Sequence, residues 1–82
     1  MDNSKEYIST VHNVDTKYLV LLKIMESRKL INLKNIAEIK DGFLDLNHLK
    51  GIIIIKTTTK EIASIAKEKI SDYIDKLSII GW

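Results

Sequence analysis

The stretch that decides the fold is residues 43–63, which read FLDLNHLKGIIIIKTTTKEIA. Residues 43–48 alternate between two sets of side chains, and this period of two is typical of a β-strand. The chain then turns at Gly51, and Ile52–Thr57 returns as an antiparallel partner. The segment therefore predicts a β-hairpin.

A long helix follows the hairpin directly. Thr58 and Glu61 have the spacing of a capping box, in which the threonine and glutamate side chains each accept a hydrogen bond from a backbone amide at the start of the helix. Apolar residues then recur at helical spacing from Ile62 to Ile80, and Gly81 is typical of a residue that ends a helix. The pattern predicts an amphipathic helix of about five to six turns.

The N-terminal part predicts a strand and a first helix. Residues 5–12 alternate with a period of two and include aromatic and β-branched residues, which favours a strand. Asn13 and Asp15 are suitable helix caps, and the pattern from Thr16 to about Leu30 is helical. Because only a narrow stripe of this segment is polar, we expect the helix to be covered on more than one side.

Residues 31–42 leave two alternatives open. The segment fits a short helix, or a strand that enters a tight turn at Asp41-Gly42. The order of elements is thus β-α-β-β-α, with a possible extra short element at 31–42. We expect a single α+β domain spanning residues 1–82, with an antiparallel three- or four-stranded sheet and two long helices on one face.

The four consecutive isoleucines at 52–55 indicate that the sheet needs a partner. Neighbouring side chains of a strand point to opposite faces, so two isoleucines point to each face. Two helices in a domain of this size cover one face, and the other face is left with apolar side chains. The alternative is that the first helix lies across the second face and closes the fold alone. We favour a partner, and the predicted interface residues are Ile52, Ile53, Ile54, Ile55 and Trp82.

The sequence shows no pattern of catalytic or metal-binding residues. There is no cysteine, and the only two histidines, His12 and His48, have no metal-ligand spacing. The three glycines are isolated, which argues against a phosphate-binding loop, and no serine lies in a nucleophile elbow. We therefore expect a chain that is not an enzyme, with no catalytic, cofactor-binding or metal-binding residues and no cofactor.

Charge and hydropathy narrow the class of partner. Residues 17–60 carry nine lysines or arginines against four aspartates or glutamates, but only Arg28 is an arginine, so nucleic acid is a secondary contact at best. The longest aliphatic runs, at 19–22 and 52–55, are too short to cross a bilayer. We expect no membrane contact and a cytoplasmic location.

The hairpin and final helix within residues 43–63, together with the order of elements over nearly the whole chain, resemble the Pcc family. These proteins are the small dimer-forming subunits of the archaeal and eukaryotic KEOPS complex. The resemblance implies a non-catalytic structural subunit of a KEOPS-like complex that makes threonylcarbamoyl-adenosine in tRNA. It also implies the partners: a second copy or a homologous small subunit, the catalytic subunit of the complex, and weakly tRNA. The last helix lacks the arginine-rich character of the principal family members, which fits a divergent paralogue.

Two other functions are alternatives. Residues 57–63 are similar to the opening of a helix-turn-helix, and residues 73–82 to the end of the recognition helix in a winged-helix DNA-binding protein. No turn signal interrupts the periodic pattern from Ile62 to Ile80, so we place this interpretation second. The remaining alternative is an orphan α+β interaction module.

Overall fold

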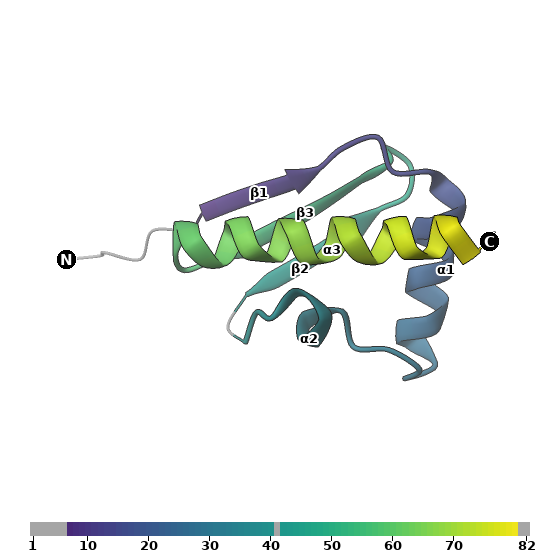
Figure 1. Ribbon diagram of the computed structural model, residues 1–82, viewed down its shortest axis with the longest axis horizontal. Coiled ribbons are helices and arrows are strands. Elements are labelled where there is room, and N and C mark those ends of the chain that lie inside the picture. The colour runs from purple at the N-terminus through teal and green to yellow at the C-terminus, as the bar shows by residue number, and fades with distance from the viewer. Residues whose placement is uncertain (1–6, 41, 81–82) are drawn as a thin grey trace.

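The computed structural model describes residues 7–40 and 42–80 and confirms the α+β class (Figure 1). The three strands form one antiparallel sheet in the order β1-β3-β2, so the isoleucine-rich strand lies in the centre. In chain order the elements are β1 (Tyr7–Val11), α1 (Thr16–Ser27), α2 (Leu33–Ala37), β2 (Phe43–Asn47), β3 (Ile52–Thr57) and α3 (Lys60–Ile80).

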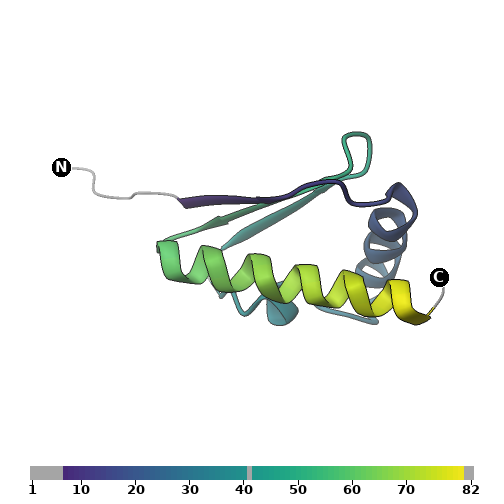
Figure 2. The same ribbon diagram turned by 45° about the horizontal axis from the view of Figure 1, so that its top comes forward.

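All three helices lie on the same side of the sheet (Figure 2). The long helix α3 runs beneath the strands, α1 stands at one end of the sheet, and α2 packs against α3 near β2. The register places Val11, Ile53 and Leu46 side by side on the face that looks toward the helices. The core forms between this face and the helices, and its side chains of lowest exposure are Leu19, Leu22, Leu33, Ile53, Ile55 and Ile70.

The turn between β2 and β3 is fixed by its glycine. Gly51 has a φ of +66°, a left-handed conformation that residues with a side chain rarely adopt. A Cβ at this position would lie 2.8 Å from the carbonyl oxygen of Val14, whose amide donates a hydrogen bond of 2.8 Å to the Gly51 carbonyl. The hairpin turn is thus joined to the segment that leads into α1.

The ambiguous connector contains a short helix. The side chain of Asn32 accepts a hydrogen bond of 3.1 Å from the amide of Asn35 and caps α2 at its N-terminus. Glu38 ends α2 in the left-handed region, and its carboxylate forms an ion pair of 3.1 Å with Lys69 of α3. Of the two alternatives, the helix is therefore the one observed; Asp41, part of the predicted turn, lies outside the described residues.

The predicted N-terminal cap of the last helix is wrong. The hydroxyl of Thr59, not Thr58, accepts the capping hydrogen bond of α3, from the amide of Ile62 at 3.2 Å. The strand ends at Thr57 as predicted, but the helix begins one residue later than expected, because the Thr57 hydroxyl donates to the Thr59 carbonyl and Thr58 stays in the connection. The predicted cap Gly81 lies outside the described residues.

The first helix is covered on one side only, contrary to expectation. Leu19 and Leu22 are buried, but Val20 and Ile24 are 39% and 46% exposed on the opposite side. The reason is the position of α1 at the end of the sheet, where it has neighbours on its inner side and none from the described residues on its outer side.

Candidate partner-binding face of the sheet

The side of the sheet opposite the helices is covered by no helix of the described residues (Figure 2), and we name it the open face. Strand register shows which residues share it, because side chains directly across antiparallel strands point to the same face. One row holds Ile8, Lys56 and Phe43, and the next holds Thr10, Ile54 and Asp45. A third row holds Ile52 and Asn47.

Four of the eight residues named on the open face are large apolar residues, although this side of the sheet has no helix over it. Ile8 is 63% exposed and Phe43 is 53% exposed, while Ile52 and Ile54 are half-buried. Burying a large aliphatic or aromatic side chain stabilises a protein by about 1.5–3 kcal/mol relative to full exposure. Four such side chains on one face therefore leave a sizeable free energy available to a protein that covers them.

Two opposite charges stand among these apolar residues. Lys56 lies between Ile8 and Phe43, with its ammonium 5.9 Å from the centre of the Phe43 ring. Asp45 is exposed and lies one strand away and two residues further along the strand. Neither residue forms an ion pair within residues 7–40 and 42–80, so both charges are available to a partner.

The predicted interface residues divide between the two faces. Ile53 and Ile55 are 0% exposed and belong to the core, so they cannot touch a partner. Ile52 and Ile54 lie on the open face. Trp82 lies outside the described residues. The first helix does not lie across the second face, which was the alternative to a partner.

Sequence reasoning missed the two most exposed apolar residues of the open face, Ile8 and Phe43. Both were within predicted strands, and the signal that identifies them is the register: each lies directly opposite Lys56 on β3. The predicted hairpin could have placed Phe43 across from Lys56 by counting back from the turn. Ile8 required the pairing of β1 with β3, which is a contact between distant parts of the sequence.

Asp15 and His48 lie apart from this face and have structural roles. Asp15 caps α1 by accepting a hydrogen bond of 3.1 Å from the amide of Lys17. His48 lies in the hairpin turn, where its carbonyl accepts a hydrogen bond from the hydroxyl of Thr16 and its ring lies 3.5 Å from the ammonium of Lys23. Across the described ranges, no three histidines or carboxylates gather where they could hold a metal ion.

The last helix provides no helix-turn-helix. α3 continues without a break from Lys60 to Ile80, so it contains no turn that would divide it into a positioning helix and a recognition helix. Charged residues also alternate with apolar ones along α3. No helix in the described part of the chain is both long and apolar enough to span a bilayer.

Comparisons with known proteins gave no match. Neither the models of protein families, nor the curated proteins, nor the solved structures contain one that matches this chain.

Proposed function

We propose that this chain is a non-catalytic subunit that acts by binding another protein through the open face of its sheet. The observation that supports the proposal is the row of Ile8, Lys56 and Phe43 beside Ile54, an apolar and uncovered surface on the central and edge strands. Most antiparallel sheets with one solvated face place polar residues there. This sheet places isoleucine and phenylalanine there, which is the composition of a face that is buried in an assembly.

The partner that fits this face best is a second copy of the chain. In a two-fold interface the same patch meets itself, so each positive group must find a negative one at the matching place. With strands about 4.8 Å apart and about 3.4 Å per residue, the Cα atoms of Lys56 and Asp45 are separated diagonally by about 8 Å. A two-fold axis between them, lying in the interface and perpendicular to that diagonal, sets each lysine against the aspartate of the other copy.

The same axis also arranges the apolar residues. It brings Ile54 close to Ile54 of the second copy and Phe43 close to Phe43 of the second copy. It also brings Ile8 close to Ile52 of the second copy. The strands of the two sheets then cross at about 70°, which is nearer to the orthogonal class of sheet packing than to the aligned class. One operation thus satisfies both charges and covers all four apolar side chains, which supports the choice of a second copy.

The wider assembly in this proposal is a KEOPS-like complex for tRNA modification. This part rests on the resemblance in topology and length, with a homologous small subunit as the other candidate for the open face. The helices on the far side of the sheet would remain free to hold a catalytic subunit, and tRNA would make at most a weak contact. The archaeal source and the cytoplasmic location belong to the same proposal.

Reversing the two charges tests the sheet pairing. Lys56→Glu alone and Asp45→Lys alone each place two pairs of like charges across the proposed interface. Because juxtaposed like charges cost several kcal/mol, each variant should associate more than about 100-fold more weakly than the native chain. An equimolar mixture of the two variants should form a heterodimer, since every lysine then meets a carboxylate. Sedimentation equilibrium measures the association constants of the native chain, of each variant alone and of the mixture.

The control is Lys67→Glu, which makes the same charge change on the exposed outer side of α3 and should leave the association constant unchanged. Failure of the mixture to associate, although both variants fold and the native chain dimerises, contradicts the proposed axis. If the native chain is monomeric alone but purifies from its organism with a small paralogue, the open face is the interface of a heterodimer. A tagged pull-down tests the KEOPS part of the proposal. That part is contradicted if the pull-down recovers neither such a paralogue nor the catalytic ATPase and kinase-like components.

A further inference from the structure

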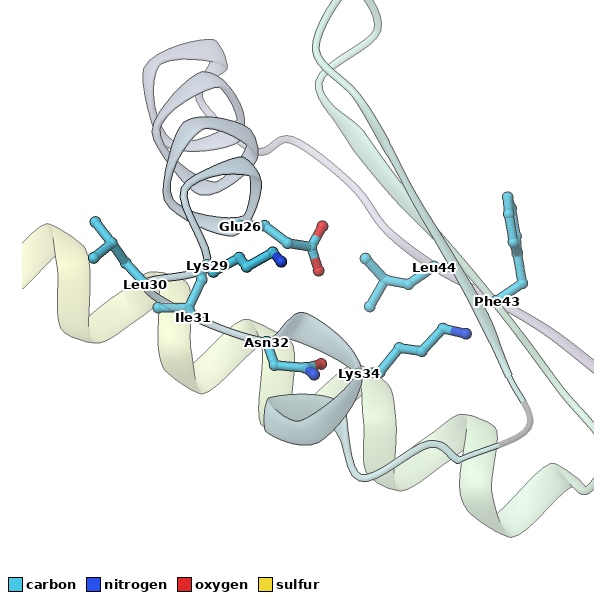
Figure 3. A pocket seen from close by; sticks show the side chains of 8 residues that line it. All are labelled: Glu26, Lys29, Leu30, Ile31, Asn32, Lys34, Phe43 and Leu44. Atoms are coloured by element: carbon cyan, nitrogen blue, oxygen red, sulfur yellow. The ribbon is translucent and has the colours of Figure 1, made fainter.

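A groove with a volume of about 850 Å³ lies between the end of α1, the start of α2 and the first two residues of β2 (Figure 3). The strand order makes β2 an edge strand, bonded to β3 on one side only. No backbone hydrogen bond joins its outer edge to another segment of the described chain. The groove is lined by Glu26, Lys29, Leu30, Ile31, Asn32, Lys34, Phe43 and Leu44.

The groove combines an apolar centre with positive charge at its sides. Leu44 points into it from β2, and the ammonium groups of Lys29 and Lys34 lie on either side of that leucine in Figure 3. Neither lysine forms an ion pair in the part of the chain that the structure describes. The one acidic residue of the lining, Glu26, accepts a hydrogen bond of 3.2 Å from the amide of Leu33. This hydrogen bond holds the Glu26 carboxylate in place but leaves its negative charge, so the two lysines and one glutamate give the lining a net charge of +1.

Lys29 stands where glycine is the favoured residue. Its φ is 60°, and the amide of the following residue, Leu30, bonds to the carbonyl of Met25 at 2.9 Å, which is the C-terminal motif that usually ends on glycine. A residue with a side chain is disfavoured in this conformation. This position is occupied by a lysine that lines the groove, and Glu38 at the end of α2 has the same φ of 60°.

We propose that the edge of β2 binds an extended acidic segment of another protein by strand addition. In this mode the added segment pairs its backbone with the free edge, and alternate side chains enter the pockets beside it. An apolar side chain of the segment would lie against Leu44. The residues two positions before and after it point to the same side and would carry carboxylates to Lys29 and Lys34. This site shares only Phe43 with the open face and does not depend on the proposed function.

The test uses a synthetic peptide with the required alternation, acetyl-Thr-Asp-Thr-Val-Thr-Asp-Thr-amide, titrated into the ¹⁵N-labelled full chain. The expected result is a set of saturable amide shifts at Leu44 and its neighbours on β2, with slower hydrogen exchange of the β2 amides. A matched peptide with asparagine in place of both aspartates should bind about tenfold more weakly, because it lacks both ion pairs.

Two variants and a control connect the affinity to the lysines. Lys29→Gly suits the left-handed backbone and so keeps the turn while removing the side chain, and Lys34→Ala removes the second ammonium. Each should weaken binding of the acidic peptide by about twofold to fivefold and leave the asparagine peptide unaffected. Lys67→Ala on α3 should change neither. The proposal is overturned if the shifts fall on β1 and β3 and not on β2, if both peptides bind equally, or if no β2 amide shifts at millimolar peptide.

Discussion

At the scale of single residues, one step along β3 separates the core from the open face. Ile53 is 0% exposed beneath the helices, while its neighbour Ile54 is half-buried between Thr10 and Asp45. Truncation of a buried isoleucine to alanine costs both its transfer free energy and a cavity. We therefore expect Ile53→Ala to lower the free energy of unfolding by about 2–5 kcal/mol, and Ile54→Ala to lower it by about 1 kcal/mol in the monomer.

Urea unfolding of dilute protein measures both values, since dilution removes any contribution of a partner to Ile54. Equal losses for the two variants would contradict the assignment of faces. The sequence alone predicted that the four isoleucines divide two and two, because a strand alternates strictly. The run itself has no polar residue that marks the wet side, although Lys56 directly after it shares the face of Ile52 and Ile54. The pairing of Ile53 with Val11 and Leu46 decides which pair faces the helices.

At the scale of elements, the start of α3 depends on one hydroxyl. The Thr59 side chain caps the amide of Ile62, whereas the described structure shows no hydrogen bond from the Thr58 side chain. Replacing an N-cap threonine by alanine typically costs about 1 kcal/mol. Thr59→Ala should therefore lower the free energy of unfolding by about that amount, and Thr58→Ala, the matched control, should change it by less than about 0.5 kcal/mol. Chemical denaturation of both variants checks the assignment, and the reverse order of effects would restore the original prediction of the cap.

Elements were predictable where a pattern was long, and their ends were less so. The period of β2 and β3 and the repeat of α3 extend over enough residues to identify each element. The ends depend on single side chains that compete: three consecutive threonines offer three possible caps, and the hydrogen bonds of Thr57 and Thr59 select the last. The α2 segment is too short for a helical repeat to be visible, so Asn32, its capping residue, carries the only local signal.

The outer side of α1 shows that the packing of an element is also hard to predict from its own sequence. Val20 and Ile24 gave the helix an apolar circumference, from which coverage on several sides was expected. A helix at the end of a three-stranded sheet has too few neighbours for that, and how many neighbours an element has is a property of the whole arrangement, not of its own sequence. For the same reason, the sequences of the strands alone do not predict that Ile8 and Phe43 lie on the uncovered face.

At the scale of the whole molecule, 82 residues build a core on one side of a three-stranded sheet and leave the other side apolar. Small domains of this size have little stability to spare. If the open face is buried against a second copy, association and folding are coupled, and the stability of each chain must rise with protein concentration. The melting temperature of the native chain should then increase by roughly 3–6 °C for each tenfold increase in concentration, because a tenfold change contributes about 0.7 kcal/mol per chain.

Lys56→Glu and Asp45→Lys should each show a melting temperature that does not change with concentration, and their equimolar mixture should regain the dependence of the native chain. Differential scanning calorimetry over two decades of concentration distinguishes these cases. A native chain whose melting temperature is constant over that range would show that the chain folds without the second copy, and that the apolar face is buried only when a different protein is present. The two single-charge variants would then be tested against that protein, and the one that loses binding would identify the sign of the charge that the partner presents to the open face.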